Sequence, residues 1–489
     1  MLELKTADLK KETITTLIIP VCEDKAIHSN RTVSSLIKRA QKLEEFAGKK
    51  GETAVFYAPE ELAANRVILM GLGESEKLDP EALRALTGKA VKKAIRNHLS
   101  DILVAVPSDK KTGIETGRML EAMLEGGYLG NHIFDRYRGE KKETPLTAIG
   151  FHVSAAAAKK FAGLPSRVET ICAGTVLARE WVSVPANDKK PEHYAASIAG
   201  QAEEAGLGVT VLDDAALAEK KFGAMLAVGQ GSAAKPRLVI LEYKAKRAKK
   251  TVALVGKGVT FDSGGLNLKV GGGISNMKMD MAGSAAVAAT MMAVARLKPA
   301  YNVVGIMPLV ENMPSGTAIH TGDIVTSYAG KTVEISNTDA EGRLILIDAI
   351  AYAIETWQPD TLIDLATLTG ACAIALGEKL AGVFSPDDGL ARDIVASGGT
   401  THERCWQMPL PADYKDLLKS DFADINNMSS SKWGGAIAAA LFLSEFVRDT
   451  RWAHIDMAGP AYATKGTDYC GPGGTGFGVR LLCDLLEKL

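Results

Sequence analysis

Residues 333–354 read VEISNTDAEGRLILIDAIAYAI. The apolar alternation that opens this stretch is typical of a strand, and the long apolar run after Arg343 is typical of a helix. Between them, Asp339, Glu341 and Arg343 stand at alternate positions. In an open α/β sheet, the crevice beyond the carboxyl ends of the strands holds the ligand. Charges there are costly to bury unless something pairs them, and a metal ion would do so.

A second charged stretch, residues 256–280, reads GKGVTFDSGGLNLKVGGGISNMKMD and follows a predicted strand at 252–255. Among its glycines it holds Lys257, Asp262, Lys269 and Asp280. With Asp339 and Glu341, two loops at strand ends supply four carboxylates, which would repel one another strongly if unpaired. Two divalent cations would neutralise them, and such oxygen-rich ligation suits Mn²⁺, Mg²⁺ or Zn²⁺.

Structural roles are open to each of these residues. Asp262 could cap a turn, and Asp280 could be the N-cap of the helix that follows it. Asp339 and Glu341 could form a capping arrangement for their own helix, with the three positive residues as surface salt-bridge partners. Each of these interpretations is the stronger one for a residue taken alone. The set of seven favours a functional site because its members fall in two loops that both begin at predicted strand ends.

Bulk composition limits the class of protein. At 489 residues the chain is too long for one ordinary core, so two domains are expected. A formal net charge of −1 offers no electrostatic reason for a nucleic-acid or membrane partner. The six cysteines form no CxxC pair, the first residues are charged rather than apolar, and the longest apolar run, 436–443, is too short to span a membrane. A cytoplasmic location is therefore expected.

The pattern of elements predicts an α/β protein. In the first part we expect strands at 13–21, 54–57, 66–71 and 102–106 and helices at 80–97, 115–125 and 155–162. A helical connector covers 167–181, and the domain boundary is placed between residues 165 and 166. In the second part we expect a mixed sheet with helices on both faces, with strands at 208–212, 238–242, 252–255, 303–307, 333–335, 361–365 and 452–457 and helices at 282–297 and 344–356.

The two charged stretches together resemble the leucyl aminopeptidase family, the two-metal cytosolic aminopeptidases. The resemblance rests on NTDAEGRL, GKGVTFDSGG, Lys269 and KMDMAGSAA, and it continues through DLATLTGA at 364–371 and WAHIDMAGPA at 452–461. It implies a smaller macro-like α/β domain at 1–165, a larger α/β catalytic domain at 166–489 and a homohexamer. One departure is Val270, where many members of the family have proline.

The same resemblance assigns roles to individual residues. The implied ligands of two divalent metal ions, Mn²⁺ or Zn²⁺, are Lys257, Asp262, Asp280, Asp339 and Glu341. The implied catalytic residues that are not ligands are Lys269 and Arg343. A bicarbonate is implied on Arg343, held also by backbone amides near Gly342 and Leu368.

The resemblance predicts an aminopeptidase that releases N-terminal residues, preferably leucine and other apolar ones, by attack of a metal-activated water. Its partners would be peptides with a free N-terminus. The alternative is a DNA-binding regulatory protein built on the same fold, against which the near-neutral charge argues.

Overall fold

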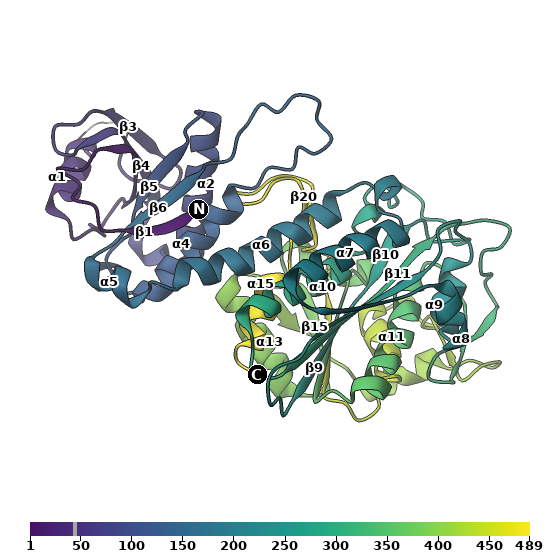
Figure 1. Cartoon of the computed structure of the whole chain (residues 1–489). Coiled ribbons are helices and arrows are strands. Elements are labelled where there is room, and N and C mark those ends of the chain that lie inside the picture. The colour runs from purple at the N-terminus through teal and green to yellow at the C-terminus, as the bar shows by residue number, and fades with distance from the viewer. Residues whose placement is uncertain (43–45) are drawn as a thin grey trace. The chain divides into compact units, whose positions relative to one another are not determined.

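The computed structural model describes residues 1–42 and 46–489 (Figure 1). The chain divides into two units. The smaller unit comprises Met1–Cys172 and Lys465–Gly471, and the larger comprises Ala173–Thr464 and Pro472–Leu489. Each unit takes in a segment near the C-terminus, so neither is a simple stretch of sequence.

The smaller unit is built on a six-stranded sheet in the order β1-β6-β5-β2-β4-β3. All neighbouring pairs are parallel except β3 and β4. Its strands are β1 (Leu2–Lys5), β2 (Ile14–Cys22), β3 (Thr53–Tyr57), β4 (Ala64–Gly73), β5 (Asp101–Ala105) and β6 (Ala148–His152). Its helices are α1 (Arg31–Ala40), α2 (Pro80–Arg96), α3 (Asp109–Thr112), α4 (Thr116–Gly130) and α5 (Ala155–Lys160), and α6 (Leu164–Ser183) runs from this unit into the next.

The larger unit is built on a nine-stranded sheet in the order β16-β15-β18-β14-β9-β11-β8-β7, with β10 pairing β11 off this path. The central strands β18, β14, β9 and β11 are parallel, and β8 and β15 join them antiparallel. This confirms the predicted mixed sheet, except that the strand expected at 333–335 does not belong to it and lies in a separate three-stranded sheet. The strands are β7 (Gly208–Leu212), β8 (Arg237–Tyr243), β9 (Thr251–Gly256), β10 (Gly258–Asp262), β11 (Asn302–Asn312), β14 (Thr361–Ala366), β15 (Ala381–Phe384), β16 (Cys405–Gln407) and β18 (Trp452–Asp456).

Helices flank this sheet (Figure 1). Helix α10 (Ala282–Leu297) packs against β9, β11 and β14, and α11 (Glu341–Trp357) packs against β9 and β11. The core cluster around α11 takes Ala253 and Val255 from β9 but not the intervening Leu254, as expected when alternate side chains point to opposite faces. The other helices are α7 (Pro191–Ala205), α8 (Asp214–Glu219), α9 (Gly223–Gly229), α12 (Gly370–Leu376), α13 (Asp388–Thr401), α14 (Gly435–Ser444) and α15 (Val479–Leu486).

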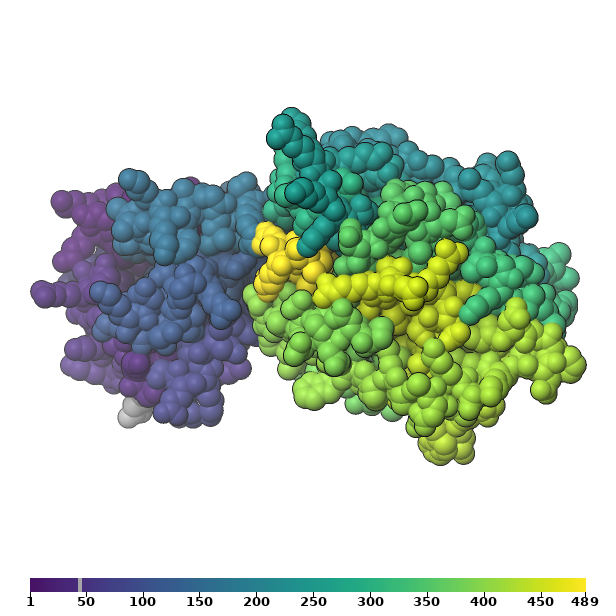
Figure 2. Space-filling view, turned by 90° about the horizontal axis from the view of Figure 1, so that it is seen from below, coloured from purple at the N-terminus to yellow at the C-terminus, as the bar shows by residue number. Residues whose placement is uncertain are grey.

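Segments far along the chain contribute much of the outside of this unit. Figure 2 shows a face of it made in large part of segments coloured green to yellow, from the C-terminal half. A small sheet in the order β12-β13-β17 lies in this half, formed by β12 (Ile324–Thr326), β13 (Thr332–Glu334) and β17 (Ile425–Asn426). Among the described residues, no helix combines the length and the apolar character that crossing a membrane requires.

Most predicted elements are present, but one helix boundary and one additional strand in the charged stretches differ from the prediction. Helix α10 covers the predicted residues 282–297, whereas α11 begins at Glu341 rather than at residue 344. The first turn of α11 holds charged residues and a glycine, so the apolar pattern did not reveal it. Strand β10 lies inside a glycine-rich stretch that the sequence predicted to be a loop, and it pairs β11 with a shift in register.

Candidate metal centre

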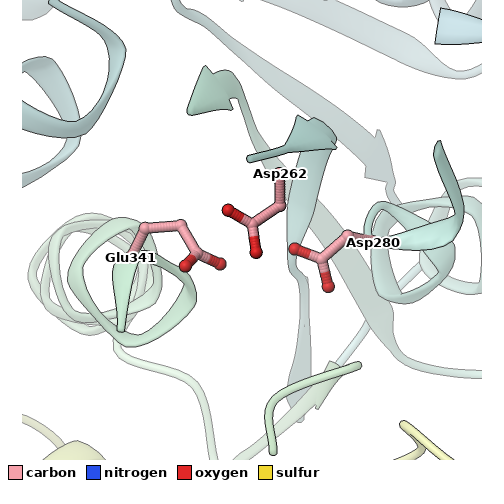
Figure 3. Close-up of side chains that lie close together, drawn as sticks. All are labelled: Asp262, Asp280 and Glu341. Atoms are coloured by element: carbon pink, nitrogen blue, oxygen red, sulfur yellow. The ribbon is translucent and has the colours of Figure 1, made fainter. Parts of the chain in front are cut away.

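Three buried carboxylates converge in the larger unit. Asp262 ends β10, Asp280 lies just before α10, and Glu341 opens α11. Each offers an oxygen within 4.8 Å of an oxygen of the other two. Figure 3 shows the three side chains pointing toward one another, Asp262 from a strand and Glu341 from a helix. Residues from both charged stretches of the sequence therefore meet at one place.

Lys257 lies between β9 and β10 and extends into this cluster. Its Nζ is 2.7 Å from Oδ2 of Asp280 and 2.9 Å from Oε1 of Glu341. The same amine donates a hydrogen bond of 3.0 Å to the backbone oxygen of Thr367. A β-carbon on Gly342 would lie 2.7 Å from this Nζ. The glycine after Glu341 therefore gives the lysine room to reach its carboxylates.

Lys269 brings the remaining carboxylate into contact with the cluster. Its Nζ lies 2.7 Å from Oδ2 of Asp262 and 2.7 Å from Oδ1 of Asp339. Asp339 stands in the turn before α11 and is one-third exposed, whereas the side chain of Asp262 is 2% exposed. The cluster thus has a closed side and a side open to solvent.

The electrostatics of the cluster favour an added cation. Burial raises the pKa of Asp262, Asp280 and Asp339, and mutual repulsion among the carboxylates adds to the effect. Burial alone lowers the pKa of Lys257, but Asp280 and the neighbouring carboxylates outweigh it and raise that pKa overall. Four carboxylates facing two ammonium groups leave two negative charges in excess when all are ionised.

Three buried oxygens of the cluster accept no hydrogen bond: Oδ2 of Asp280, Oδ1 of Asp339 and Oε2 of Glu341. The first two each face a lysine ammonium group at 2.7 Å, whereas Oε2 of Glu341 has no ion pair among the described residues. An unpaired carboxylate oxygen in a buried site is unfavourable, and it is suited to a cation at that point. Oxygen ligands of this kind are those that hard divalent ions take. The residues present therefore fit a metal ion.

Arg343 lies on the same helix as Glu341 but binds none of the carboxylates. Its side chain is 6% exposed, and burial lowers its pKa to about 10. Nη1 donates a hydrogen bond of 2.8 Å to the backbone oxygen of Asn427, and the guanidinium lies 6.0 Å from the ring centre of Phe442. Its Nε is buried without an acceptor. Such a cation is suited to an anionic ligand.

The two residues that were expected to offer backbone amides have different surroundings. Gly342 packs against Lys257, as described above. The amide of Leu368 donates a hydrogen bond of 3.1 Å to Oδ1 of Asp456. An anion held by the Leu368 amide would have to share or replace that hydrogen bond.

Simple capping roles account for only one of the carboxylates. Oδ1 of Asp262 accepts a hydrogen bond of 2.9 Å from the amide of Gly264, so it does cap a turn, while its other oxygen faces Lys269. Helix α10 has Met281 as its N-cap and α11 has Ala340, and neither cap makes a side-chain hydrogen bond. The other three carboxylates are therefore not explained as caps.

The sequence reasoning missed Asn312, and it did not predict the contact that Thr367 makes with the cluster. Asn312, at the end of β11, donates hydrogen bonds to Oδ1 of Asp262 at 2.9 Å and to the backbone oxygen of Thr338 at 3.1 Å. Thr367 donates through Oγ1 to Oδ1 of Asp280 at 2.7 Å. Both follow predicted strands, and a polar residue at the carboxyl end of a central strand was the signal available.

Comparison with family models identifies both parts of the chain. Residues 176–483 match the catalytic domain of the cytosol aminopeptidase family. Residues 21–141 match the N-terminal domain of the same family. The three buried carboxylates lie within the catalytic match.

Curated relatives and solved structures agree with this match. A probable cytosol aminopeptidase of Syntrophotalea carbinolica is 45% identical over 91% of this chain and 90% of its own. A probable cytosol aminopeptidase of Protochlamydia amoebophila is 41% identical over 91% of this chain and 89% of its own. The bottromycin maturation enzyme BotP in complex with Mn has a TM-score of 0.87 and 33% identity, over 97% of this chain and 99% of its own. None of these names supports the DNA-binding alternative. The chain is a hydrolase of the cytosol aminopeptidase family.

Proposed function

We propose that this protein is a metal-dependent aminopeptidase that releases N-terminal residues, preferably leucine and other apolar ones, from peptides. The observation that carries the proposal is the convergence of Asp262, Asp280 and Glu341, within 4.8 Å, inside the family's catalytic domain. A further support is that the similar enzyme BotP was solved in complex with Mn.

In this proposal two divalent ions, Mn²⁺ or Zn²⁺, share the cluster. Asp262, Asp339 and Glu341 would hold one ion, and Lys257, Asp262, Asp280 and Glu341 would hold the other. When bound, the ions supply Lewis acidity and a water of lowered pKa. Lys257 would have to bind as a neutral amine, and adjacent dications favour that form.

The remaining charged residues would act on the peptide. Lys269, as an ammonium group at the open side of the cluster, would stabilise negative charge that develops on the peptide carbonyl oxygen. Removing one such donor typically costs about 3–4 kcal/mol of transition-state stabilisation. The buried guanidinium of Arg343 would hold a bicarbonate that takes a proton from the attacking water and passes it to the leaving amine. The buried Nε without an acceptor supports an anion at this position.

The test is metal removal and reloading. Protein stripped with a chelator should lose release of leucine from a leucine-headed tripeptide, and addition of Mn²⁺, Zn²⁺, Mg²⁺ or Co²⁺ in turn should restore it to different extents. The same tripeptide with an acetylated N-terminus is the matched control and should stay intact, because the site requires a free amine. Full activity of the stripped protein, or cleavage of the acetylated peptide, contradicts the proposal.

The proposal extends to the assembly, which we expect to be a homohexamer in the cytoplasm. Its support is the family resemblance. Light scattering coupled to size-exclusion chromatography measures the mass of the assembly. A monomer at assay concentration would contradict the proposed homohexamer but not the proposed activity.

A further inference from the structure

Asn427 is a buried asparagine that follows β17 and has no assigned role. Its side chain is fully buried. Its Oδ1 accepts hydrogen bonds from the amides of Ser336 at 2.9 Å and Asn337 at 3.3 Å, and its Nδ2 donates to the backbone oxygen of Asn337 at 2.8 Å. Its own amide donates to the backbone oxygen of Glu334 at 2.9 Å. One side chain thus continues the pairing of β13 with β17 beyond the end of both strands.

These hydrogen bonds reach the carboxylate cluster through one further residue. Oδ1 of Asn337 accepts a hydrogen bond of 2.8 Å from the amide of Asp339. Oδ1 of Asp339 in turn lies 2.7 Å from Nζ of Lys269. The position of the Asp339 carboxylate therefore depends on a turn whose backbone Asn427 holds on both its donor and its acceptor side.

The same residue also holds the buried arginine. Its backbone oxygen accepts the 2.8 Å hydrogen bond from Nη1 of Arg343. Asn427 therefore contacts two parts of the site: the turn that carries Asp339 and the guanidinium of Arg343. A shift of its backbone would move the two groups relative to each other.

We propose that Asn427 is a positioning residue that sets the separation between the Asp339 carboxylate and the Arg343 guanidinium. This inference rests on the proposed function, in which one group holds a metal ion and the other an anion. Hydrogen bonds that orient ligand residues typically contribute 10–100-fold to metal affinity or activity. A displacement of about 1 Å can reduce the rate by about a hundredfold.

Asn427→Asp is the direct test because it conserves volume and keeps an acceptor but removes the donor to Asn337. We expect Mn²⁺ binding, measured by calorimetry on stripped protein, to weaken about 10–100-fold at one of two sites. With saturating Mn²⁺, kcat for a leucine amide should fall by a similar factor, while KM changes less. In Asn427→Ala, which removes both donor and acceptor, Mn²⁺ affinity and kcat should fall by at least as large a factor.

Asn426 provides the matched control. It precedes Asn427, but its Nδ2 donates to Oγ of Ser336 at 2.7 Å and to Oε2 of Glu334 at 3.3 Å rather than to the backbone of the turn. Asn426→Ala, which adds no charge beside Glu334, should keep Mn²⁺ affinity and kcat within about twofold of the wild type. A loss in this control equal to that in Asn427→Ala overturns the inference, because the effect would then belong to the strand.

Two other results overturn the inference. One is wild-type Mn²⁺ affinity and kcat in both Asn427 variants. The other is a lowered melting temperature with unchanged Mn²⁺ affinity in the folded protein, which marks a merely structural residue. If the wild type binds Mn²⁺ but does not cleave peptides, the proposed function fails while the calorimetric comparison still tests Asn427.

Discussion

At the scale of single residues, the cluster depends on close approaches that few side chains permit. Glu341 presents one oxygen to Lys257 at 2.9 Å and keeps the other buried without a partner. The next residue is a glycine, and a β-carbon there would lie 2.7 Å from Nζ of Lys257, so any larger residue would displace the lysine. Both residues therefore contribute to the contact with Lys257: Glu341 supplies the carboxylate, and Gly342 leaves room for the lysine side chain.

Replacement of Glu341 by glutamine tests the residue with the unpaired oxygen. The amide has the same shape, but it removes a charge and offers the cation one oxygen only. We expect metal affinity to fall by at least about a hundredfold, since even residues that only orient ligands contribute 10–100-fold. The measurement is bound metal per chain after dialysis against a fixed Mn²⁺ concentration.

Glu355→Gln is the control for this change. Glu355 lies on the same helix, α11, and its side chain is 57% exposed. Its replacement should leave bound metal unchanged. Equal metal content in wild type and Glu341→Gln would exclude Glu341 as a ligand.

At the scale of elements, two lysines donate hydrogen bonds to the last backbone oxygens of α6. The last carbonyl groups of a helix lack partners within it and carry a partial negative charge. Nζ of Lys189 donates to the backbone oxygens of Trp181 at 2.8 Å and Val182 at 3.2 Å, and Lys278 donates to that of Ser183 at 3.0 Å. Burial, with the charge of Lys278, lowers the pKa of Lys189 well below its usual range.

Lys189 also ties this helix end to the loop that carries Asp280. Its Nζ donates to the backbone oxygen of Lys278 at 2.7 Å. Lys189→Met would fill the space but leave three carbonyl oxygens without this donor. A buried polar group left unpaired costs about 1–3 kcal/mol, so we expect a loss of stability of at least that size.

The measurement is the urea-unfolding midpoint, with Lys190→Met as the control. Lys190 is the adjacent residue, its side chain is exposed, and it caps α7 without a side-chain hydrogen bond. The free energy of unfolding of the control should lie within about 0.5 kcal/mol of the wild-type value. If both variants unfold alike, Lys189 does not stabilise the end of α6.

At the scale of the whole molecule, the two units are built on separate sheets, and a buried histidine in the smaller unit bears on stability at low pH. In the smaller unit, His28 is buried with Nε2 2.7 Å from the backbone oxygen of Pro20. Burial lowers its pKa from 6.5 to about 4. Between pH 4 and pH 6.5, His28 is therefore mostly protonated in the unfolded chain but mostly neutral in the folded protein.

Stability of the smaller unit should therefore fall as the pH drops from 6.5 toward 4. The loss from His28 alone amounts to about 3 kcal/mol, at 1.36 kcal/mol for each unit of pKa difference. His28→Gln can still donate to Pro20 and does not titrate, so it should show a smaller loss over this range. The measurement is the urea midpoint at pH 7 and at pH 4.5.

His193→Gln is the comparison variant, since His193 is exposed on α7 of the larger unit. It should keep the pH dependence of the wild type. An unchanged pH dependence in His28→Gln would show that His28 does not control acid stability.

Much of the fold was predictable because its signals are local. The helix predicted at 282–297 is α10, with the same ends, and the strand predicted at 208–212 is β7. The candidate site was predicted because Asp262, Asp280, Asp339 and Glu341 stand in two short motifs. Each motif can be identified from residues that are close together in the sequence.

Other features could not be read in this way because they depend on contacts between distant segments. The start of α11 at Glu341 follows no apolar pattern, and β10 forms only where β11 offers it a partner. Asn427 is one of two adjacent asparagines, and nothing in the sequence distinguishes it from Asn426. Its contacts with Ser336 and Asn337 span about 90 residues of chain.

The sequence by itself determined which residues can carry charge and metal, since ligand chemistry belongs to the side chain. The tertiary structure alone decided how those residues are paired: Lys257 with Asp280 and Glu341, and Lys269 with Asp262 and Asp339. It also decided that Arg343 forms no ion pair with a carboxylate among the described residues, although the charges of Glu341 and Asp456 act on it from further away. The physical reason is that pairing depends on distance and burial, which arise only when strands and helices from distant parts of the chain pack together.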